Sequence, residues 1–531
     1  MESSPDLSDT DQQRCAAALA DLAARSAPFS SDQLQAILRR HPRSDNRLFT
    51  RDQLLAVYQR LCADGRMRFD PSLVRRLRLK PGRTLSGVAP VTVLTAPHPC
   101  RGDCIYCPTV ASAPKSYLPD EPGVQRALRF DYDPCAQTAG RVRALAHIGH
   151  PTDKVELLIL GGTWSDYDPD YQEWFVRRCL DALNGSDAPS LGEAQRRNET
   201  ARHRAVGLAV ETRPDCVTLE EVRRLRRLGV TRVQLGVQSL DERILALNRR
   251  GHTVADTRAA VRRLRLAGFK ITLHWMPNLL GATPESDYED FQRLWDDPAL
   301  RPDELKIYPC LLLEGTDLHE LWQAGEYRPY DEETLIRLLL DCKPLIPPYC
   351  RVNRLMRDIP APDIAAGVAR SNLRQVVQQR LAEAGRSCRC IRCREVRDEP
   401  VEPDELRLTD TVYETDATTE HFLAGETPQG RLAGFLRLSL PQAQPEMEEL
   451  RGGAVVRELH VYGPALEMGD RQDGRPQHAG LGTRLLTTAR RMAHEAGYRQ
   501  LAVIAAVGTR PYYRARGFAL EGSYMVRGRL D

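Results

Sequence analysis

The run PVTVLTAPHPCRGDCIYCP, residues 90–108, joins an apolar strand to three closely spaced cysteines. These are Cys100, Cys104 and Cys107, in the spacing C-x3-C-x2-C. Three thiolates in so short a loop can bind three irons of a cubane iron–sulfur cluster, and the fourth iron is then open to a small molecule. A structural zinc knuckle, or buried thiols without a metal, is the alternative interpretation.

The segments that follow this loop alternate between short apolar runs and helical patterns. The apolar runs lie at 91–96, 154–162, 205–213, 232–239, 270–277 and 304–309, and helical patterns occupy stretches such as 219–229 and 254–268. This alternation predicts an α/β chain with βαβ units and a parallel sheet. Six strands favour a partial (β/α)6 barrel, with ligands at the carboxyl ends of its strands, where the cysteine loop falls.

The cysteine spacing and the strand before it resemble the signature of radical S-adenosylmethionine (SAM) enzymes. In that superfamily SAM binds the open iron and is cleaved to a 5′-deoxyadenosyl radical. The resemblance implies a [4Fe-4S] cluster held by the three cysteines, with SAM as a second cofactor.

Length and composition set the outer bounds. A chain of 531 residues exceeds what one core supports, so several domains are expected. No apolar run reaches the length of a membrane span, and the polar, acidic start is unlike a signal peptide, which predicts a cytoplasmic protein without a membrane partner. In that compartment the 14 cysteines are metal ligands and free thiols rather than disulfides.

Positive charge is concentrated near the start of the chain. Residues 39–83 hold 13 Lys and Arg against four Asp, a local charge of +9 in a chain whose net charge is +3. Residues 31–80 read as short amphipathic helices, and residues 1–30 as a mobile lead. So dense a basic region predicts a nucleic-acid partner, and a solvated helix surface is the alternative. Phe49, Tyr58 and Phe69 could stack on bases or pack in a core.

A second motif, QHAGLGTRLL at 477–486, resembles the glycine-rich turn of GNAT acetyltransferases. It lies between a strand at 454–463 and a helix at 483–496, and a strand at 501–507 and a short helix follow. Backbone N–H groups at such a helix start can bind the pyrophosphate of coenzyme A. The GNAT resemblance implies an acetyl-CoA site at this turn, with Tyr512 and Tyr513 near the sulfur, where a phenol could protonate a departing thiolate or merely pack.

A third motif, Cys388, Cys390 and Cys393, lies in a segment rich in proline and arginine. Thiolates at this spacing favour zinc, and cysteines without a metal are the alternative. Cys342, Cys350 and His319 are candidates for a fourth ligand. The predicted organisation is therefore a basic helical RNA-binding region (1–80), a radical SAM partial barrel (81–340), a linker with a zinc site (341–400) and a GNAT domain (401–531).

From about residue 75 to the end, the chain resembles the catalytic subunit of Elongator, in its single-protein bacterial form. The matching segments include TLSGVAPVTVL, CIYCP, DKVELLILGGT, LGVQSL, NRRGHT, LKIYPCLLLEGT, VRELHVYG and VGTRPYYRARGF. The resemblance implies an acyltransferase that builds a carboxymethyl precursor on C5 of the wobble uridine 34 of tRNA. Acetyl-CoA would supply two carbons, the SAM-derived radical would activate the acetyl methyl group, and hydrolysis of the thioester would follow.

The resemblance also implies roles for individual residues. On the acetyl-CoA side these are Lys154, Glu458, Leu459, His460, Val461, Gln477, Gly480, Leu481, Gly482, Thr483 and Tyr513. For SAM, the strand-end loop supplies Gly161, Gly162 and Thr163. Polar residues at other strand ends, namely Glu211, Arg213, Gln238 and His274, are candidates for SAM or uridine contacts or for a buried network. Arg351, Arg354 and Arg357 are candidates for tRNA phosphates.

Lysine usage supports Lys154 independently. Only six of the 75 basic residues are lysine, so a remaining lysine marks a position where the rigid fork of arginine is a poor substitute. The same reasoning selects Lys270 and Lys306, and chance retention is the alternative for each.

Two rival functions remain open from sequence: a protein lysine acetyltransferase with a structural cluster, and a tRNA-binding scaffold without catalysis. The sequence also leaves open which tRNAs are modified, whether accessory proteins act, whether the protein is a homodimer, and how the acetyl and radical sites communicate.

Overall fold

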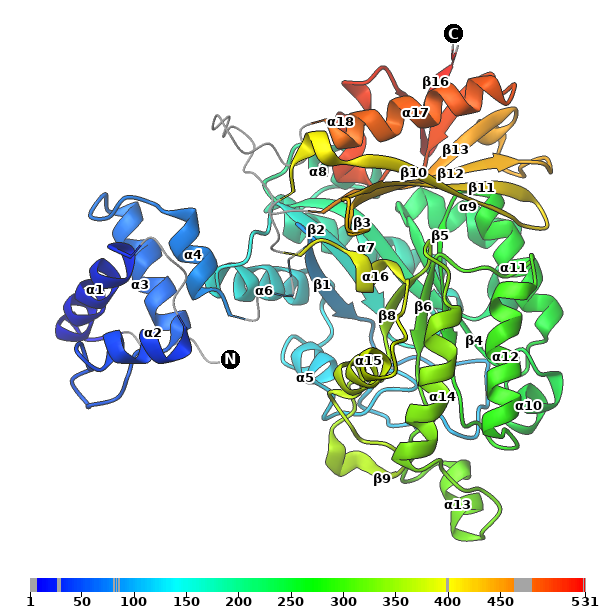
Figure 1. Cartoon of the computed structure of the whole chain (residues 1–531), viewed down its shortest axis with the longest axis horizontal. Helices are drawn as coiled ribbons and strands as arrows, with labels where there is room; N and C mark the ends of the chain where they lie inside the picture. The colour runs from blue at the N-terminus through cyan, green and yellow to red at the C-terminus, as the bar shows by residue number, and fades with distance from the viewer. Residues whose placement is uncertain are drawn as a thin grey trace.

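The computed structural model describes residues 7–25, 30–79, 82, 84, 86–397, 401–462, 480–528 and 530. Its first part is a helical unit that projects from the rest of the molecule (Figure 1). The unit has an apolar core of its own, to which Leu54 and Leu73 contribute. Its helices are α1 (Asp9–Ala23), α2 (Ser31–Leu38), α3 (Arg51–Ala63) and α4 (Pro71–Leu77).

Helix α1 corrects the expectation of a mobile lead over residues 1–30. Cys15, Ala18, Leu19 and Leu22 recur at helical spacing and are fully buried. Ser8 accepts a hydrogen bond from the Asp11 backbone and so begins the helix. The acidic, polar face of α1 concealed this apolar stripe.

The middle of the chain forms a parallel sheet, which has seven strands within the described residues. All six strands expected from sequence are present, and β8 adds a seventh beside β6. The strands, in spatial order, are β1 (Ala89–Leu94), β2 (Lys154–Leu160), β3 (Arg204–Thr212), β4 (Arg232–Gln238), β5 (Lys270–Trp275), β6 (Glu304–Ile307) and β8 (Arg351–Arg354).

Side chains alternate across this sheet because its strands are extended. Along β2, Val155, Leu157 and Ile159 are buried on the outer face against helices, whereas Glu156 and Leu158 point to the inner face. The connecting helices are α5 (Pro122–Leu128), α6 (Pro134–His147), α7 (Pro169–Asn184), α8 (Leu191–Asn198), α9 (Leu219–Leu228), α10 (Glu242–Leu247), α11 (Val254–Leu266), α12 (Pro284–Asp296), α13 (Asp317–Gln323) and α14 (Glu332–Leu345).

A short segment links this sheet to the C-terminal part. Strands β7 (Leu312–Leu313) and β9 (Ile364–Ala366) pair with each other, and α15 (Leu373–Glu383) and α16 (Ile391–Arg394) follow. Helix α16 contacts β8, so the linker lies against the last strand of the parallel sheet. None of the helices in the described ranges is long and apolar enough to span a membrane.

The C-terminal part is a second sheet, again of seven strands where the structure describes it. Only β13 and β14 pair in parallel, and α17 packs on the face formed by β11 to β14. In spatial order the strands are β10 (Arg407–Glu414), β11 (Thr418–Glu426), β12 (Leu432–Pro441), β13 (Gly453–Val461), β14 (Gln500–Val503), β16 (Tyr524–Gly528) and β15 (Ala519–Glu521), with helices α17 (Leu481–Glu495) and α18 (Arg510–Arg514).

A β-bulge in β13 joins the two sheets. Arg437 faces Glu458 but Leu438 faces Val456, so Arg457 is one extra residue in the ladder. Its side chain crosses to the first sheet, where both terminal nitrogens donate to Asp303 at 2.7 and 2.6 Å.

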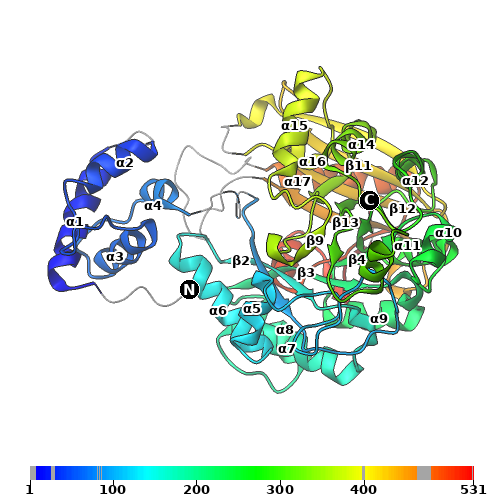
Figure 2. The same ribbon diagram turned by 90° about the horizontal axis from the view of Figure 1, so that it is seen from below.

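The C-terminal sheet lies across one end of the parallel sheet (Figures 1 and 2). Further polar contacts hold it there. Glu199, beyond α8, accepts hydrogen bonds from Arg514 and Arg510 of α18. Tyr524 of β16 donates to the carbonyl of Ala267 at 2.8 Å. The two sheets thus form one body with a fixed interface.

Candidate functional site

The cysteine triplet lies in the loop after β1, at the carboxyl end of the parallel strands. Cys100, Cys104 and Cys107 are all half-buried. Arg250 Nη1 donates to Cys104 Sγ at 3.1 Å, and Thr163 Oγ1 lies 3.4 Å from Cys100 Sγ. Burial, followed by the neighbouring Cys104, raises the pKa of the Cys107 thiol to about 12. The loop therefore gathers three cysteine side chains, with the Arg250 guanidinium against one of them.

The triplet differs in geometry from a site for a single ion. In the part of the chain that the structure describes, the only cysteine, histidine or carboxylate group with ligand atoms within 4.8 Å of one another is Cys388, Cys390 and Cys393. The Cys100–Cys107 loop thus spreads its thiols more widely than ligands of one zinc ion. This spacing fits a larger iron–sulfur cluster better than the zinc-knuckle alternative.

The loop after β2 lies against the cysteine loop. Gly161 has φ +135°, and a Cβ there would collide with Thr95 Oγ1. Gly162 has φ +83° and packs on Lys115. Only glycine combines these backbone conformations with so close an approach. The predicted Gly161–Thr163 segment is therefore adjacent to the cysteines through Thr163.

The carboxyl ends of the next strands hold a buried polar group. Lys306 Nζ donates to Glu211 Oε1 at 2.7 Å, and Tyr117 donates to Glu211 Oε2 at 3.3 Å. Burial raises the pKa of Glu211, but Lys306 and His274 outweigh it and hold the pKa at about 2. Burial and Lys306 lower the pKa of His274 to about 3, so this imidazole is neutral at pH 7.

Two predicted SAM contacts carry polar atoms without a hydrogen-bond partner among the described residues. Arg213 pairs with Asp215 at 3.0 Å, yet its Nη1 is buried beside Gly102 with no acceptor. Gln238 adopts φ +69°, and its Oε1 is also buried and unpaired. Arg213 thus lies beside the cysteine loop, and Gln238 lines the same cavity as Cys107. Unsatisfied buried atoms at such positions are the pattern expected of a site that takes a polar ligand.

A second polar layer lies at the amino ends of the same strands. Lys270 Nζ donates to Glu458 Oε1 of β13 at 2.6 Å and lies 3.5 Å from Glu304. Arg232 pairs with Glu304 and Glu156, both at 3.1 Å. At about 3.3 Å per residue, Lys270 lies about 13 Å along β5 from His274. Lys270 and Lys306, selected by lysine usage, thus belong to different layers.

One cavity of about 830 Å³ contains both layers. Cys107 and Tyr106 line it at the cysteine loop, Lys306 and Lys270 line it in the two polar layers, and Tyr513 lines it on the C-terminal side. The cavity is therefore a continuous space along the inner face of the parallel sheet, with residues of β13 in its lining.

The predicted acetyl-CoA residues gather on β13 and the start of α17. Glu458, Leu459 and His460 line the cavity, and Val461 lies near Gly482. Gly480 precedes α17 with φ +86°, and Leu481, Gly482 and Thr483 form its first turn. This turn leaves backbone N–H groups free for an anion. Gln477 lies outside the described residues.

The two tyrosines of α18 face different surroundings. Tyr513 is buried and lines the cavity, and its burial raises the pKa of its hydroxyl. Tyr512 stacks under Arg516, whose guanidinium carbon lies 3.6 Å from the ring centroid. Its hydroxyl approaches Gly482. Tyr513 is therefore the one that reaches the shared space.

Lys154 is the first residue of β2, at the amino end of the parallel sheet. It is in register with Arg204, and Gly508 packs against Arg204 just before α18. The C-terminal part thus faces the end of the sheet that carries Lys154.

The three arginines predicted to bind tRNA phosphates differ in whether their side chains are free of internal contacts and exposed at the surface. Arg351 donates to Glu395 at 2.8 Å and to Tyr462 at 3.0 Å, and Arg357 pairs with Glu121 at 3.0 Å. Arg354 has an exposed side chain, paired with Asp358. Arg351 and Arg357 thus serve internal contacts, which leaves Arg354 as the candidate at the surface.

The aromatic residues of the basic region also divide. Phe49 and Tyr58 are buried in the core of the helical unit, which confirms packing as their use. Phe69 is 51% exposed and stacks on Tyr58, with ring centroids 6.3 Å apart. It is the one aromatic residue of the three that could contact a base.

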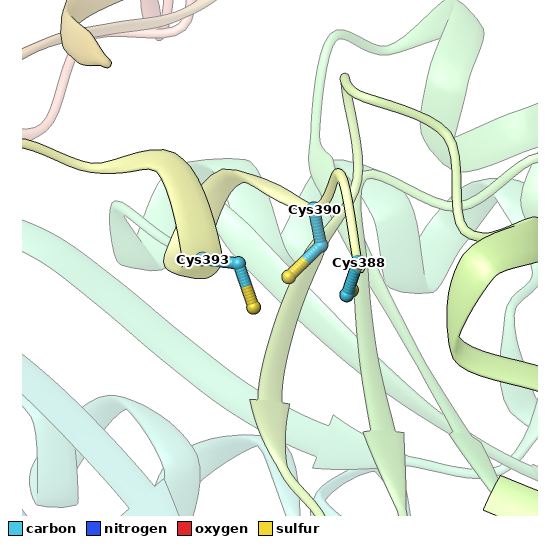
Figure 3. A group of neighbouring side chains, drawn as sticks. All are labelled: Cys388, Cys390 and Cys393. Atoms are coloured by element: carbon cyan, nitrogen blue, oxygen red, sulfur yellow. The ribbon is translucent and has the colours of Figure 1, made fainter. Parts of the chain in front are cut away.

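The third cysteine motif forms a compact group in the linker (Figure 3). Cys390 precedes α16 and Cys393 lies within it. Hydrogen bonds from the Cys388 and Cys393 thiols, followed by Lys343, lower the pKa of Cys390. The candidates for a fourth ligand, Cys342, Cys350 and His319, have no ligand atom within 4.8 Å of all three sulfurs. The backbone carbonyl of Cys350 does accept a hydrogen bond from the Ile391 backbone N–H at 2.9 Å.

Several residues of this site had no sequence signal. Arg250, which contacts Cys104, and the pair Asp303–Arg457 look like ordinary surface charges in the sequence. Their partners are more than 100 residues away, so only the fold brings them together. Arg250 lies within the segment NRRGHT, the one available hint.

Known proteins resemble this chain along most of its length. The family model described as the radical SAM superfamily matches residues 98–294, and the radical SAM C-terminal domain matches residues 302–383. A tRNA uridine(34) acetyltransferase of Dehalococcoides mccartyi is 46% identical over 84% of this chain and 99% of its own length. Elongator complex protein 3 of Danio rerio is 40% identical, over 86% of each chain.

A solved structure agrees with these matches. The archaeal Elp3 of Methanocaldococcus infernus, with an N-terminal deletion of residues 1–46, superposes with a TM-score of 0.73 at 39% identity. The alignment covers 83% of this chain and 99% of that one.

Proposed function

The chain belongs to the radical SAM family that includes tRNA uridine(34) acetyltransferase and Elongator complex protein 3, and we propose that it carries out a tRNA modification of this kind. In this proposal it uses acetyl-CoA and SAM to build a carboxymethyl group on C5 of the wobble uridine. The substrate is the anticodon stem-loop of tRNA, whose unstacked base can enter a pocket.

The continuous cavity carries this proposal. It is lined at one end by the cysteine loop and at the other by β13 and Tyr513, so one space of about 830 Å³ meets both predicted sites. A protein lysine acetyltransferase with a structural cluster would have no use for an acetyl site that opens onto the cysteine loop. The shared space favours chemistry that needs both.

The residues at the carboxyl ends of the strands fit the predicted cofactors. Cys100, Cys104 and Cys107 would hold the cluster, with Gly161–Thr163 beside them. When bound, the cluster and SAM supply a carbon-centred radical able to take hydrogen from an acetyl methyl group. The unpaired atoms of Arg213 and Gln238 would bind polar groups of SAM.

The C-terminal sheet, residues 401–531, would be a GNAT domain that binds acetyl-CoA. The first turn of α17 would receive the pyrophosphate, as helix starts do for anions. The basic helical unit, residues 1–80, would bind tRNA phosphates.

The direct test uses anaerobically reconstituted protein with SAM, a reductant, acetyl-CoA and tRNA. We expect 5′-deoxyadenosine in solution and a carboxymethyl mass increase on uridine 34 by mass spectrometry, each dependent on every component. Modified uridine without deoxyadenosine, in protein that lacks iron, would overturn the proposal.

Tyr513→Phe tests the acetyl side. Burial raises the pKa of this hydroxyl, so at neutral pH it keeps a proton that it could donate to the departing sulfur. Loss of a general acid lowers the rate of a reaction about 10²-fold or more, so we expect the rate of release of free coenzyme A to fall by that factor. Tyr498→Phe is the control, because Tyr498 lies between α17 and β14, does not line the cavity, and donates to the Pro441 carbonyl at 2.9 Å. Equal rates in the two variants would reduce Tyr513 to packing.

The linker, residues 341–400, would be pinned by a structural zinc ion on Cys388, Cys390 and Cys393. The close approach of the three thiols and the lowered pKa of Cys390 support this. Such an ion contributes to folding, because the ligands are gathered only in the native chain.

Cys390→Ala tests the zinc site. We expect the zinc content, measured by elemental analysis, to fall from about one ion per chain to near zero, with a lower unfolding temperature. Cys62→Ala, a half-buried cysteine of the helical unit, should keep the metal. Full zinc content in Cys390→Ala would contradict the assignment.

A further inference from the structure

The acetyl side of the cavity contains a carboxylate that cannot serve as a base. Glu458 Oε1 accepts from Lys270 Nζ at 2.6 Å, and Oε2 accepts from Arg437 Nε at 2.9 Å. Burial raises the pKa of Glu458, but these two cations outweigh it and lower the pKa. With a cation on each oxygen, this group is a poor proton acceptor.

His460 lies two residues further along β13, on the same face as Glu458. It lines the cavity, and its Nε2 is enclosed without a hydrogen-bond partner among the described residues. The ring packs between Tyr462 and Phe435, at centroid distances of 4.5 and 6.0 Å. These ring contacts hold His460 in place and leave its enclosed Nε2 unpaired, so a water or another polar group in the cavity is needed to satisfy it.

The charges around His460 are paired with one another. Glu458 of β13 and Lys270 of β5 form one pair, and Arg351 of β8 and Glu395, which follows α16, form the other. Burial lowers the pKa of His460 to about 4, since these balanced neighbours do not favour a charged ring. At neutral pH the imidazole is uncharged and can accept a proton.

We propose that His460 is the general base that activates water for hydrolysis of the thioester, a role that rests on the acetyl-CoA site of the proposed function. The water oxygen bonds to the thioester carbonyl carbon while Nε2 takes its proton. The carbon–sulfur bond then breaks, and the sulfur leaves as the thiol of coenzyme A with the proton of the Tyr513 hydroxyl. The proton held by Nε2 then passes through solvent to the resulting phenolate. The carbonyl carbon becomes a carboxylic acid, without an oxidant or reductant.

The test measures acetyl-CoA hydrolysis by the whole protein in the presence of tRNA. For His460→Ala we expect kcat to fall about 10²- to 10⁴-fold, with little change in KM for acetyl-CoA. The hydrolysis rate of His460→Ala should rise about tenfold per pH unit, because hydroxide then replaces the activated water. The hydrolysis rate of the wild type should be constant from about pH 6 to 8, because this range lies above the pKa of the base. Added imidazole should restore activity in the vacated space.

Two further variants separate this role from packing. His460→Gln keeps a similar volume but cannot act as a base, so it should lose kcat at an unchanged unfolding temperature. His421→Ala is the matched control, because His421 lies in the same sheet and pairs with Asp410 at the surface. A wild-type hydrolysis rate in His460→Gln would overturn the proposal. So would a loss of activity in His460→Ala that imidazole does not restore and that raises KM as much as it lowers kcat.

The same protein distinguishes this idea from the proposed function. His460→Ala should still form 5′-deoxyadenosine from SAM, because the cysteine loop is untouched. If wild-type protein hydrolyses acetyl-CoA through His460 but never modifies uridine, the proposed function is wrong and the base assignment stands.

Discussion

Cys104→Ala is expected to abolish uridine modification and 5′-deoxyadenosine formation while leaving the fold intact. The variant removes one of the three proposed cluster ligands and the acceptor of the Arg250 hydrogen bond. Loss of a residue that only hydrogen-bonds to a metal ligand lowers metal affinity or activity about 10- to 100-fold, so loss of a direct ligand should lower them further. Iron content should fall from about four atoms per chain to near zero.

The matched control is Cys135→Ala. Cys135 is also half-buried but lies outside the loop. It should keep iron, deoxyadenosine formation and modified uridine at wild-type levels. Deoxyadenosine from Cys104→Ala at a rate within tenfold of wild type would exclude the loop as the cluster site. Electron paramagnetic resonance of the reduced proteins provides an independent measure of cluster loading.

Asp303→Asn is expected to lower the free energy of unfolding by about 3–5 kcal/mol. Asp303 is fully buried and binds both terminal nitrogens of Arg457, and Arg437 lies 3.4 Å away. Without this carboxylate, two buried guanidinium groups lose a counter-charge between the two sheets. Denaturant titration of wild type and variant measures the difference.

Asp341→Asn is the control, because its pair with Arg386 is exposed on both sides and such pairs contribute about 0–1 kcal/mol.

The dependence of the unfolding free energy on acid pH supplies a second measurement. Burial raises the pKa of Asp303, but Arg457 and Arg437 outweigh it and lower the pKa below that of the unfolded chain. The stabilisation is therefore present above about pH 4 and is lost as pH falls further, so Asp303→Asn should show a weaker acid dependence. Equal unfolding free energies for Asp303→Asn and wild type would contradict the interlock.

The parallel sheet was predictable because buried strands read as apolar runs. Strand β8 escaped prediction, since Arg351 and Arg354 flank a single buried Val352 and resemble a basic surface segment. The fold shows why arginine is tolerated there: Arg351 is bound by Glu395 and Tyr462. Strands β10 and β11 were missed because polar residues interrupt their apolar positions.

The cysteine motifs could be predicted because their residues are neighbours in sequence. The polar layers could not, because Lys270 meets Glu458 and Arg457 meets Asp303 over separations of 188 and 154 residues. Lysine rarity pointed to Lys270 and Lys306 but could not indicate that they belong to different layers. The choice between Tyr512 and Tyr513 likewise depended on the direction in which α18 is held by Glu199.

The extra residue in β13 has a consequence for how such a protein could arise. Arg457 at the insertion also pairs with Glu420 of its own sheet, but Asp303 has its ion-pair partners Arg457 and Arg437 on the other sheet, so the first half alone would hold an unbalanced buried charge. An ancestor that fused two free-standing enzymes would have had to acquire the insertion and its acidic receptor together. Modern halves exchanged between distant species should therefore assemble poorly unless both positions travel as a unit.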